Sequence, residues 1–174
     1  MSDIRPITLN VNGVEQTVHV PPRMTLADCL RDEIGLTGTH LGCEHGVCGA
    51  CTILMDGSSA RSCLILAVQA EGHAVVTIEG LSSENGDLHP LQAAFAEKHG
   101  LQCGFCTPGM ILSACELIQE NSDPSQTEMS EQLSGNLCRC TGYTKIFESV
   151  TAAAEVMRNS DPVAVGNHEN GAVQ

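Results

Sequence analysis

The chain has 174 residues, and its 21 acidic against 8 basic residues give a formal net charge of −13. This excess of negative charge argues against nucleic acid and anionic membrane surfaces as partners, because the chain offers no basic patch to contact phosphates. The length suits one domain or two small ones. No stretch approaches the roughly 20 apolar residues that a membrane-spanning helix needs, so we expect no membrane insertion.

Aromatic residues are scarce, with no tryptophan, one tyrosine and three phenylalanines. A core with so few large side chains benefits from bound metal, because a structural metal site contributes folding energy directly. The first residues, MSDIRPITLNVNG, lack the apolar run of an export signal. Ten cysteines in a chain without such a signal favour metal ligation over disulfides, and we expect a cytoplasmic protein.

The first half of the chain is predicted to be rich in β-structure. Apolar and polar residues alternate over 7–11 and 14–20, on either side of the hairpin-forming pair Asn12-Gly13. Thr25 is placed to cap a short helix, because Asp28 follows it by three residues.

A glycine-rich loop over 42–51 follows and leads into a predicted strand over 52–55. An apolar run over 64–70 is predicted to be helical, and 74–78 is predicted to be the last strand of this half. Strands, a helix, a ligand loop and further strands together predict an α+β domain of the β-grasp type over residues 1–81.

The second half changes to helical periodicity. Four helices are predicted, over 90–98, 107–120, 126–134 and 144–158. They form two helical hairpins, each with a cysteine-containing loop, and predict a four-helix-bundle domain over 82–158. The polar stretch 82–87 is the expected boundary between the domains, and 159–174 is expected to be a flexible tail.

A first set of cysteines has the spacing C-x4-C-x2-C-x11-C, formed by Cys43, Cys48, Cys51 and Cys63. Three closely spaced cysteines followed by a distant one is the ligand pattern of plant-type [2Fe–2S] ferredoxins. Glycines interleave with these ligands and let the backbone wrap closely around a compact cluster. A zinc site is the alternative, but four-cysteine zinc sites usually combine two C-x2-C units.

A second set has the spacing C-x2-C-x31-C-x-C, formed by Cys103, Cys106, Cys138 and Cys140. By spacing alone this set suits an iron–sulfur cluster or zinc. A second cluster beside the first would form a relay for electrons, which favours iron–sulfur. The two remaining cysteines, Cys29 and Cys115, are expected to be small hydrophobic core residues.

Two other side chains near the predicted ligands have open roles. Arg139 lies between Cys138 and Cys140. It is either an exposed ion-pair partner, which contributes little, or a charge that raises the cluster potential or contacts an anionic partner cofactor. His45 lies in the first loop, but that set already has four cysteines, so we expect no ligand role. The sequence contains no nucleophile–base pair, P-loop or dinucleotide fingerprint, so we expect no substrate site in this chain.

The segments around both cysteine sets resemble a known family. LGCEHGVCGACT, over 41–52, resembles the ferredoxin-type loop of the xanthine dehydrogenase family of molybdenum hydroxylases. QCGFCTPGM, over 102–110, and GNLCRCTGY, over 135–143, resemble that family's second-cluster signatures. The similarity extends from about Ile7 to Val150 and is specifically to the small iron–sulfur subunit, since no flavin or molybdenum domain follows.

The resemblance implies two partner subunits and a direction for electrons. It implies a large subunit that holds molybdenum on a molybdopterin dinucleotide and a medium subunit that holds FAD, in a heterotrimer or its dimer. The second cluster would then lie next to the pterin, with Gln102 and Cys140 contacting it, and the first would lie towards FAD. Electrons would pass one at a time from molybdenum to FAD. The segment over 61–72 is most similar to subunits of N-heteroaromatic dehydrogenases.

Two alternatives to a subunit of a molybdenum hydroxylase stay open from the sequence. A free two-cluster ferredoxin would act as a mobile electron carrier and would purify alone. A zinc-stapled interaction module would be colourless and contain zinc without iron or acid-labile sulfide.

Overall fold

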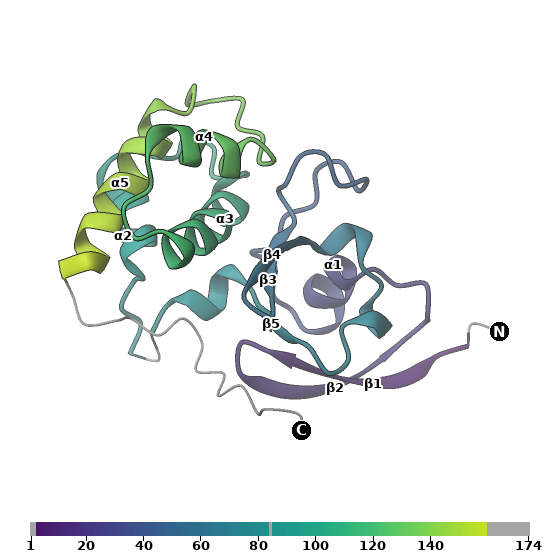
Figure 1. The fold of residues 1–174 in the computed structure, drawn as a ribbon. Helices are drawn as coiled ribbons and strands as arrows, with labels where there is room; N and C mark the ends of the chain where they lie inside the picture. The colour runs from purple at the N-terminus through teal and green to yellow at the C-terminus, as the bar shows by residue number, and fades with distance from the viewer. Residues whose placement is uncertain (1–2, 84, 160–174) are drawn as a thin grey trace.

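The protein forms two lobes in the computed structural model, which describes residues 3–83 and 85–159 (Figure 1). The first lobe contains a five-stranded sheet with strand order β2-β1-β5-β3-β4 and the short helix α1, Leu26–Asp28. β1 and β5 are parallel, and the other neighbouring strands are antiparallel. The strands are β1 (Arg5–Val11), β2 (Val14–Val20), β3 (Thr52–Met55), β4 (Ser58–Arg61) and β5 (Ala74–Val76). This mixed sheet agrees with the predicted α+β class of β-grasp type.

The N-terminal hairpin forms as the sequence predicts. Asn12 and Gly13 both have positive φ, 53° and 79°, which a tight two-residue hairpin turn requires. Val11 therefore pairs directly with Val14. The predicted cap of α1 is also present, since the Asp28 amide donates to Thr25 Oγ1 at 3.1 Å.

Two predictions in this lobe were wrong in detail, and one strand was not predicted. The apolar run over 64–70 is not one helix but two short 3₁₀ turns, Ser62–Leu64 and Ala67–Gln69. Leu66 between them is extended and pairs with Thr25, which prevents a continuous helix. β4 was missed because its sequence, SSAR, lacks apolar alternation, and it forms by folding back along β3. The strand predicted over 74–78 ends at Val76.

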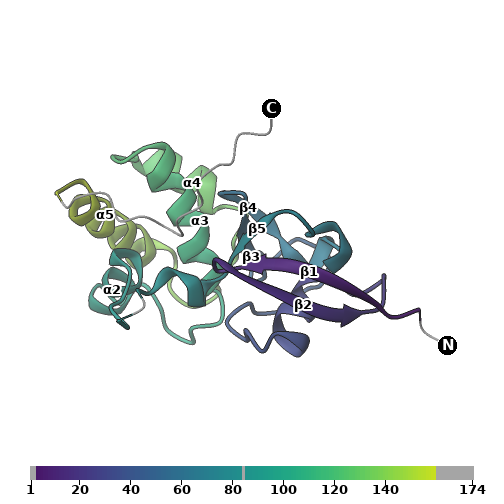
Figure 2. The same cartoon turned by 90° about the horizontal axis from the view of Figure 1, so that it is seen from below.

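The second lobe contains the four predicted helices, with boundaries that differ from the predicted ones by at most one residue. Ser125 and Glu128 form the expected capping box at the start of α4. α2 packs against α5 and α3 against α4, while α3 also packs on β3 and so joins the lobes (Figures 1 and 2). The helices are α2 (Pro90–Glu97), α3 (Thr107–Glu120), α4 (Gln126–Leu133) and α5 (Thr144–Asn159). Because α5 includes Asn159, the predicted tail can begin no earlier than residue 160, and 160–174 lies outside the described residues.

Two hydrophobic cores lie on opposite sides of the sheet. One packs β1 and β2 against α1, and the other packs the helices together with Leu54 and Val76 from the sheet. Cys29 and Cys115 are completely buried, one in each core, which confirms their predicted packing role. In the described part of the chain, no helix is both long and apolar enough to span a membrane.

Candidate iron–sulfur sites

The first cysteine set gathers at one end of the β3–β4 hairpin. Cys51 immediately precedes β3, and Cys63 lies in the 3₁₀ turn after β4. Ser62 holds these two segments together, because its hydroxyl donates to the Cys51 carbonyl at 2.7 Å. Burial raises the pKa of the Cys63 thiol to about 11, and a hydrogen bond with the Cys51 thiol adds to this effect. Cys51 and Cys63 are therefore close neighbours.

The other half of this set lies in the glycine-rich loop. The Cys48 amide donates to Cys43 Sγ at 3.4 Å. Together with the amide of His45, it lowers the pKa of Cys43 to about 6, and the Cys48 thiol contributes in the same direction. Amide donors aimed at a sulfur stabilise its thiolate form, which is the form that binds iron.

The second set joins the two helical hairpins. Cys103 and Cys106 lie between α2 and α3, whereas Cys138 and Cys140 lie between α4 and α5. The Sγ atoms of Cys103 and Cys140 are 3.6 Å apart. Burial raises the pKa of Cys106 to about 12, and a hydrogen bond with the Cys138 thiol adds to the shift. Each close pair of thiols thus takes one member from each hairpin.

Thr141 hydrogen-bonds to a thiol of the second set. Its hydroxyl lies 3.2 Å from Cys138 Sγ. Although burial opposes it, hydrogen bonding from the Thr141 hydroxyl and amide lowers the pKa of Cys138. The amide of Phe105 similarly lowers the pKa of Cys103. Both hairpins therefore supply hydrogen-bond donors to sulfur, as the first loop does.

The chemistry of the eight thiols fits two iron–sulfur clusters. In each set the thiols approach in twos, and a [2Fe–2S] cluster takes two cysteine thiolates on each of its two irons. Four thiolates repel one another when ionised, and the positive charge of bound iron compensates for this repulsion. Across residues 3–83 and 85–159, no three His, Cys, Asp or Glu side chains are grouped so as to hold a single metal ion.

The two ligand loops pack directly against each other. The Leu137 amide, next to Cys138, donates to the carbonyl of Cys48 at 2.9 Å. Glycine makes this approach possible, because a Cβ on Gly49 would lie 2.4 Å from the carbonyl oxygen of Gly135. One backbone hydrogen bond therefore connects a predicted ligand of the first set to the residue beside a predicted ligand of the second.

A buried polar network beside this contact was missed by the sequence reasoning. Asn136 is 1% exposed, and its Nδ2 donates to the Gly49 carbonyl at 3.0 Å and to Thr52 Oγ1 at 3.1 Å. Its Oδ1 accepts from the Ser113 hydroxyl at 2.9 Å. Arg61 of β4 also joins the network. The signal available in the sequence was a polar residue two positions before Cys138, but its partners are distant along the chain.

The other residues considered from the sequence lie on the surface, three near the second set and His45 in the first loop. Gln102 and Cys140 are both exposed and adjacent, with Gln102 Nε2 donating to the Cys140 carbonyl at 3.1 Å. Arg139 is exposed, and among the described residues it has no ion-pair or hydrogen-bond partner, so the exposed ion pair considered for it is not formed. His45 is an exposed loop residue whose Nδ1 hydrogen-bonds to the Cys43 carbonyl.

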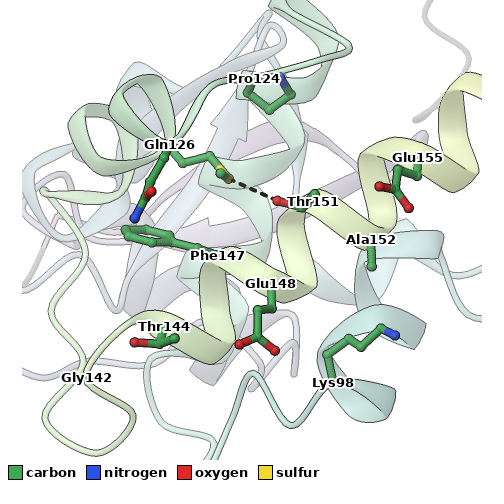
Figure 3. A pocket seen from close by; sticks show the side chains of 11 residues that line it. Lys98, Pro124, Gln126, Gly142, Thr144, Phe147, Glu148, Thr151, Ala152 and Glu155 are labelled. Carbon is green, nitrogen blue, oxygen red and sulfur yellow. Dashed lines mark hydrogen bonds between the residues drawn. The ribbon is translucent and has the colours of Figure 1, made fainter.

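A large surface cavity of about 840 Å³ lies away from the cysteines (Figure 3). Glu148, Thr151 and Glu155 of α5 line it together with Lys98 after α2 and Gln126 at the start of α4. Inside it, Thr151 Oγ1 hydrogen-bonds to the sulfur of Met129. No cysteine lines this cavity, so it does not belong to either candidate metal site.

Two family descriptions match the chain. A "2Fe-2S iron-sulfur cluster binding domain" matches residues 9–74, and a "[2Fe-2S] binding domain" matches 77–151. The nicotine 6-hydroxylase small subunit of Paenarthrobacter nicotinovorans is 55% identical over 160 residues, which cover 92% of this chain and 96% of that protein. Caffeine dehydrogenase subunit gamma of Pseudomonas sp. (strain CBB1) is 53% identical, with 90% and 97% covered.

Solved structures give the same result. A chain of quinoline 2-oxidoreductase from Pseudomonas putida 86 matches with a TM-score of 0.87 and 52% identity, over 91% of this chain and 98% of that chain. Aldehyde oxidoreductase from Desulfovibrio gigas matches with a TM-score of 0.83 and 41% identity, over 91% of this chain but only 18% of its own. The two-lobed architecture thus occurs both as a separate chain and as part of a longer one.

Proposed function

We propose that this chain transfers electrons one at a time between two partner subunits. The chain belongs to the xanthine dehydrogenase family of molybdenum hydroxylases, as a small iron–sulfur subunit. The observation that carries the proposal is the hydrogen bond from the Leu137 amide to the Cys48 carbonyl, at 2.9 Å. Through this hydrogen bond, a path from the loop that carries Cys48 to the loop that carries Cys138 crosses a single non-covalent contact. When bound, a [2Fe–2S] cluster at each set supplies one-electron redox chemistry.

The residues of this chain have separate tasks in that function. Cys43, Cys48, Cys51 and Cys63 would hold the first cluster, and Cys103, Cys106, Cys138 and Cys140 would hold the second. Amide donors at Cys43 and Cys103 stabilise the thiolate forms that bind iron. Buried Asn136 fixes the distance between the loops by bonding to the backbone of the first loop. No described side chain is assigned to substrate chemistry.

The proposed partners are a large subunit with molybdenum on a molybdopterin dinucleotide and a medium subunit with FAD, in a heterotrimer or its dimer. The names of the relatives, a small subunit and a subunit gamma, support a place in a complex. Adjacent Gln102 and Cys140 are exposed beside the second set and are available to contact the pterin. We place the FAD subunit at the first set.

The proposed substrate class is N-heteroaromatic compounds, and the proposed location is the cytoplasm. Nicotine, caffeine and quinoline appear in the names of three similar proteins, and all three are nitrogen heterocycles. The location follows from the ten cysteines, because thiol ligands persist in a reducing compartment.

Metal analysis of two cysteine variants tests the ligand assignment. Cys48→Ser should lose about half of the bound iron and acid-labile sulfide, because one of two clusters is lost. Cys115→Ala is the matched control, since Cys115 is completely buried in the helical core and should leave the metal content unchanged. Zinc in place of iron in the unaltered protein would contradict the proposal.

Native purification and reduction by substrate test the relay. The chain should co-purify with molybdenum- and flavin-containing subunits, whereas a lone chain would favour a mobile ferredoxin. In the Cys48→Ser complex, substrate should still reduce molybdenum but not flavin. Normal steady-state turnover in a complex shown to lack the first cluster would refute electron transfer through this chain.

A further inference from the structure

Arg61 connects the two lobes at the point where the ligand loops meet. It is the last residue of β4, two positions before Cys63. Its Nη1 donates to Thr52 Oγ1 at 2.7 Å, within the first lobe. Its Nη2 donates to the Gly135 carbonyl at 2.8 Å, three residues before Cys138 in the second lobe. Arg61 therefore joins the segment that carries Cys63 to the segment that carries Cys138.

The surroundings of Arg61 leave its charge without a counterion. Its acceptors are a hydroxyl, a carbonyl and, at 3.5 Å, the side-chain oxygen of Asn136, all of them neutral. In the part of the chain that the structure describes, no carboxylate lies within ion-pair distance of Arg61. A half-buried charge is screened by solvent less than an exposed one, and no partner carboxylate offsets the charge of this guanidinium.

We propose that Arg61 is a positioning and electrostatic residue shared by the two clusters, and that its charge raises the reduction potentials of both. The proposal rests on the proposed function, because it requires a cluster at each cysteine set. Reduction adds one negative charge to a cluster, so a fixed positive charge favours the reduced form. Arg61 thereby affects both the cluster that gives up the electron and the cluster that accepts it, whereas exposed Arg139 lies beside only the second set.

The expected size follows from simple electrostatics. With an effective dielectric constant of about 20, a unit charge roughly 10 Å away changes the equilibrium constant for adding an electron on the order of tenfold. For a one-electron couple, a tenfold change corresponds to about 59 mV. Because the charge acts on both clusters in the same direction, its removal should lower both potentials.

Redox titration of the purified complex, followed by electron paramagnetic resonance, tests the proposal. R61Q removes the charge and should lower both midpoint potentials. R61K retains the charge but not the forked hydrogen bonds and should keep both potentials near those of the unaltered complex. R158Q is the control for loss of a positive charge, because Arg158 is ion-paired to Asp123 at the far end of α5.

Three outcomes would overturn the proposal. Unchanged potentials in R61Q with both cluster signals present would exclude an electrostatic role, and a shift of one potential alone would exclude a shared one. An equal fall of the midpoint potentials in R61K and R61Q would assign the effect to packing. If R61Q does not assemble, R61K still allows the potentials to be measured. Absence of two cluster signals in the unaltered complex would instead refute the proposed function.

Discussion

The imidazole of His40 stacks on the ring of Phe105, with ring centroids 4.9 Å apart and an interplanar angle of 18°. His40 Nδ1 also lies 2.8 Å from the Phe105 carbonyl oxygen and hydrogen-bonds to it. Because Phe105 lies between Cys103 and Cys106, this pair attaches the first lobe to a ligand loop of the second. It is a second contact between the lobes, in addition to the hydrogen bond from the Leu137 amide to the Cys48 carbonyl.

Replacing His40 by alanine should destabilise the protein by about 1 kcal/mol, through loss of one ring contact and one hydrogen bond at a partly exposed site. The measurement is the midpoint of thermal unfolding at a fixed heating rate. His19→Ala is the control, since His19 is exposed on β2 and should give a change near zero. Equal effects of the two substitutions would show that the stacked pair contributes nothing to stability.

Gly49→Ala should lower stability and iron content far more than Gly13→Ala. Both glycines have positive φ, +74° and +79°, so alanine carries a similar backbone penalty of about 1 kcal/mol at each. A Cβ at Gly13 meets nothing within 4 Å, whereas at Gly49 it would lie 2.4 Å from the Gly135 carbonyl oxygen. The loop that carries Cys48 and the loop that carries Cys138 would then have to separate.

Iron content and unfolding midpoint together measure this difference. Gly13→Ala should keep both clusters and lower the midpoint only slightly. Gly49→Ala should lose iron as well as stability, because its loop carries Cys48 and Cys51. If the two variants match in iron content and midpoint, the close approach of the loops is not required for assembly.

His89 should make the protein less stable in mild acid. It is 3% exposed and caps α2 in its neutral form, with Nδ1 accepting from the Leu91 amide at 3.2 Å. Burial lowers the pKa of His89 below its usual value of about 6.5. The unfolded chain therefore binds this proton more readily than the folded one. Stability is fully present above about pH 6.5 and declines as the pH falls towards the folded pKa.

The measurement is the difference in unfolding midpoint between pH 7.5 and pH 5.5. His89→Asn keeps a side chain that caps helices well but cannot titrate, so the difference should become smaller. His19→Asn is the control and should leave the difference unchanged, since His19 is exposed on β2 and caps no helix. A difference as large in His89→Asn as in the unaltered protein would assign the acid sensitivity to other groups.

Local patterns predicted most elements because their causes are local. The Asn12-Gly13 turn, the Thr25 cap and the Ser125–Glu128 capping box each depend on residues within a few positions. β4 and the broken run over 64–70 were not predictable in this way. Both are decided by pairing with segments distant in the chain, β3 in one case and Thr25 in the other.

Arg61 was not singled out from the sequence for a related reason, and the role of Arg139 stays a prediction. Arg139 attracted attention because it lies between two predicted ligands, yet it is exposed and unpaired within the described residues. Arg61 has no neighbouring signal in the sequence beyond Cys63. Its contact with Gly135, 74 residues away, exists only in the folded chain.

The sequence by itself determined the fold class and the proposed ligands, because cysteine spacing and helical periodicity are properties of short segments. Only the tertiary structure decided which thiols approach as pairs and how the two sets are connected. Cys103 meets Cys140, and the Leu137 amide meets the Cys48 carbonyl, across 37 and 89 positions of the chain. Such contacts arise from the packing of α3 on β3 and from glycines that let two backbones touch, and no local pattern encodes them.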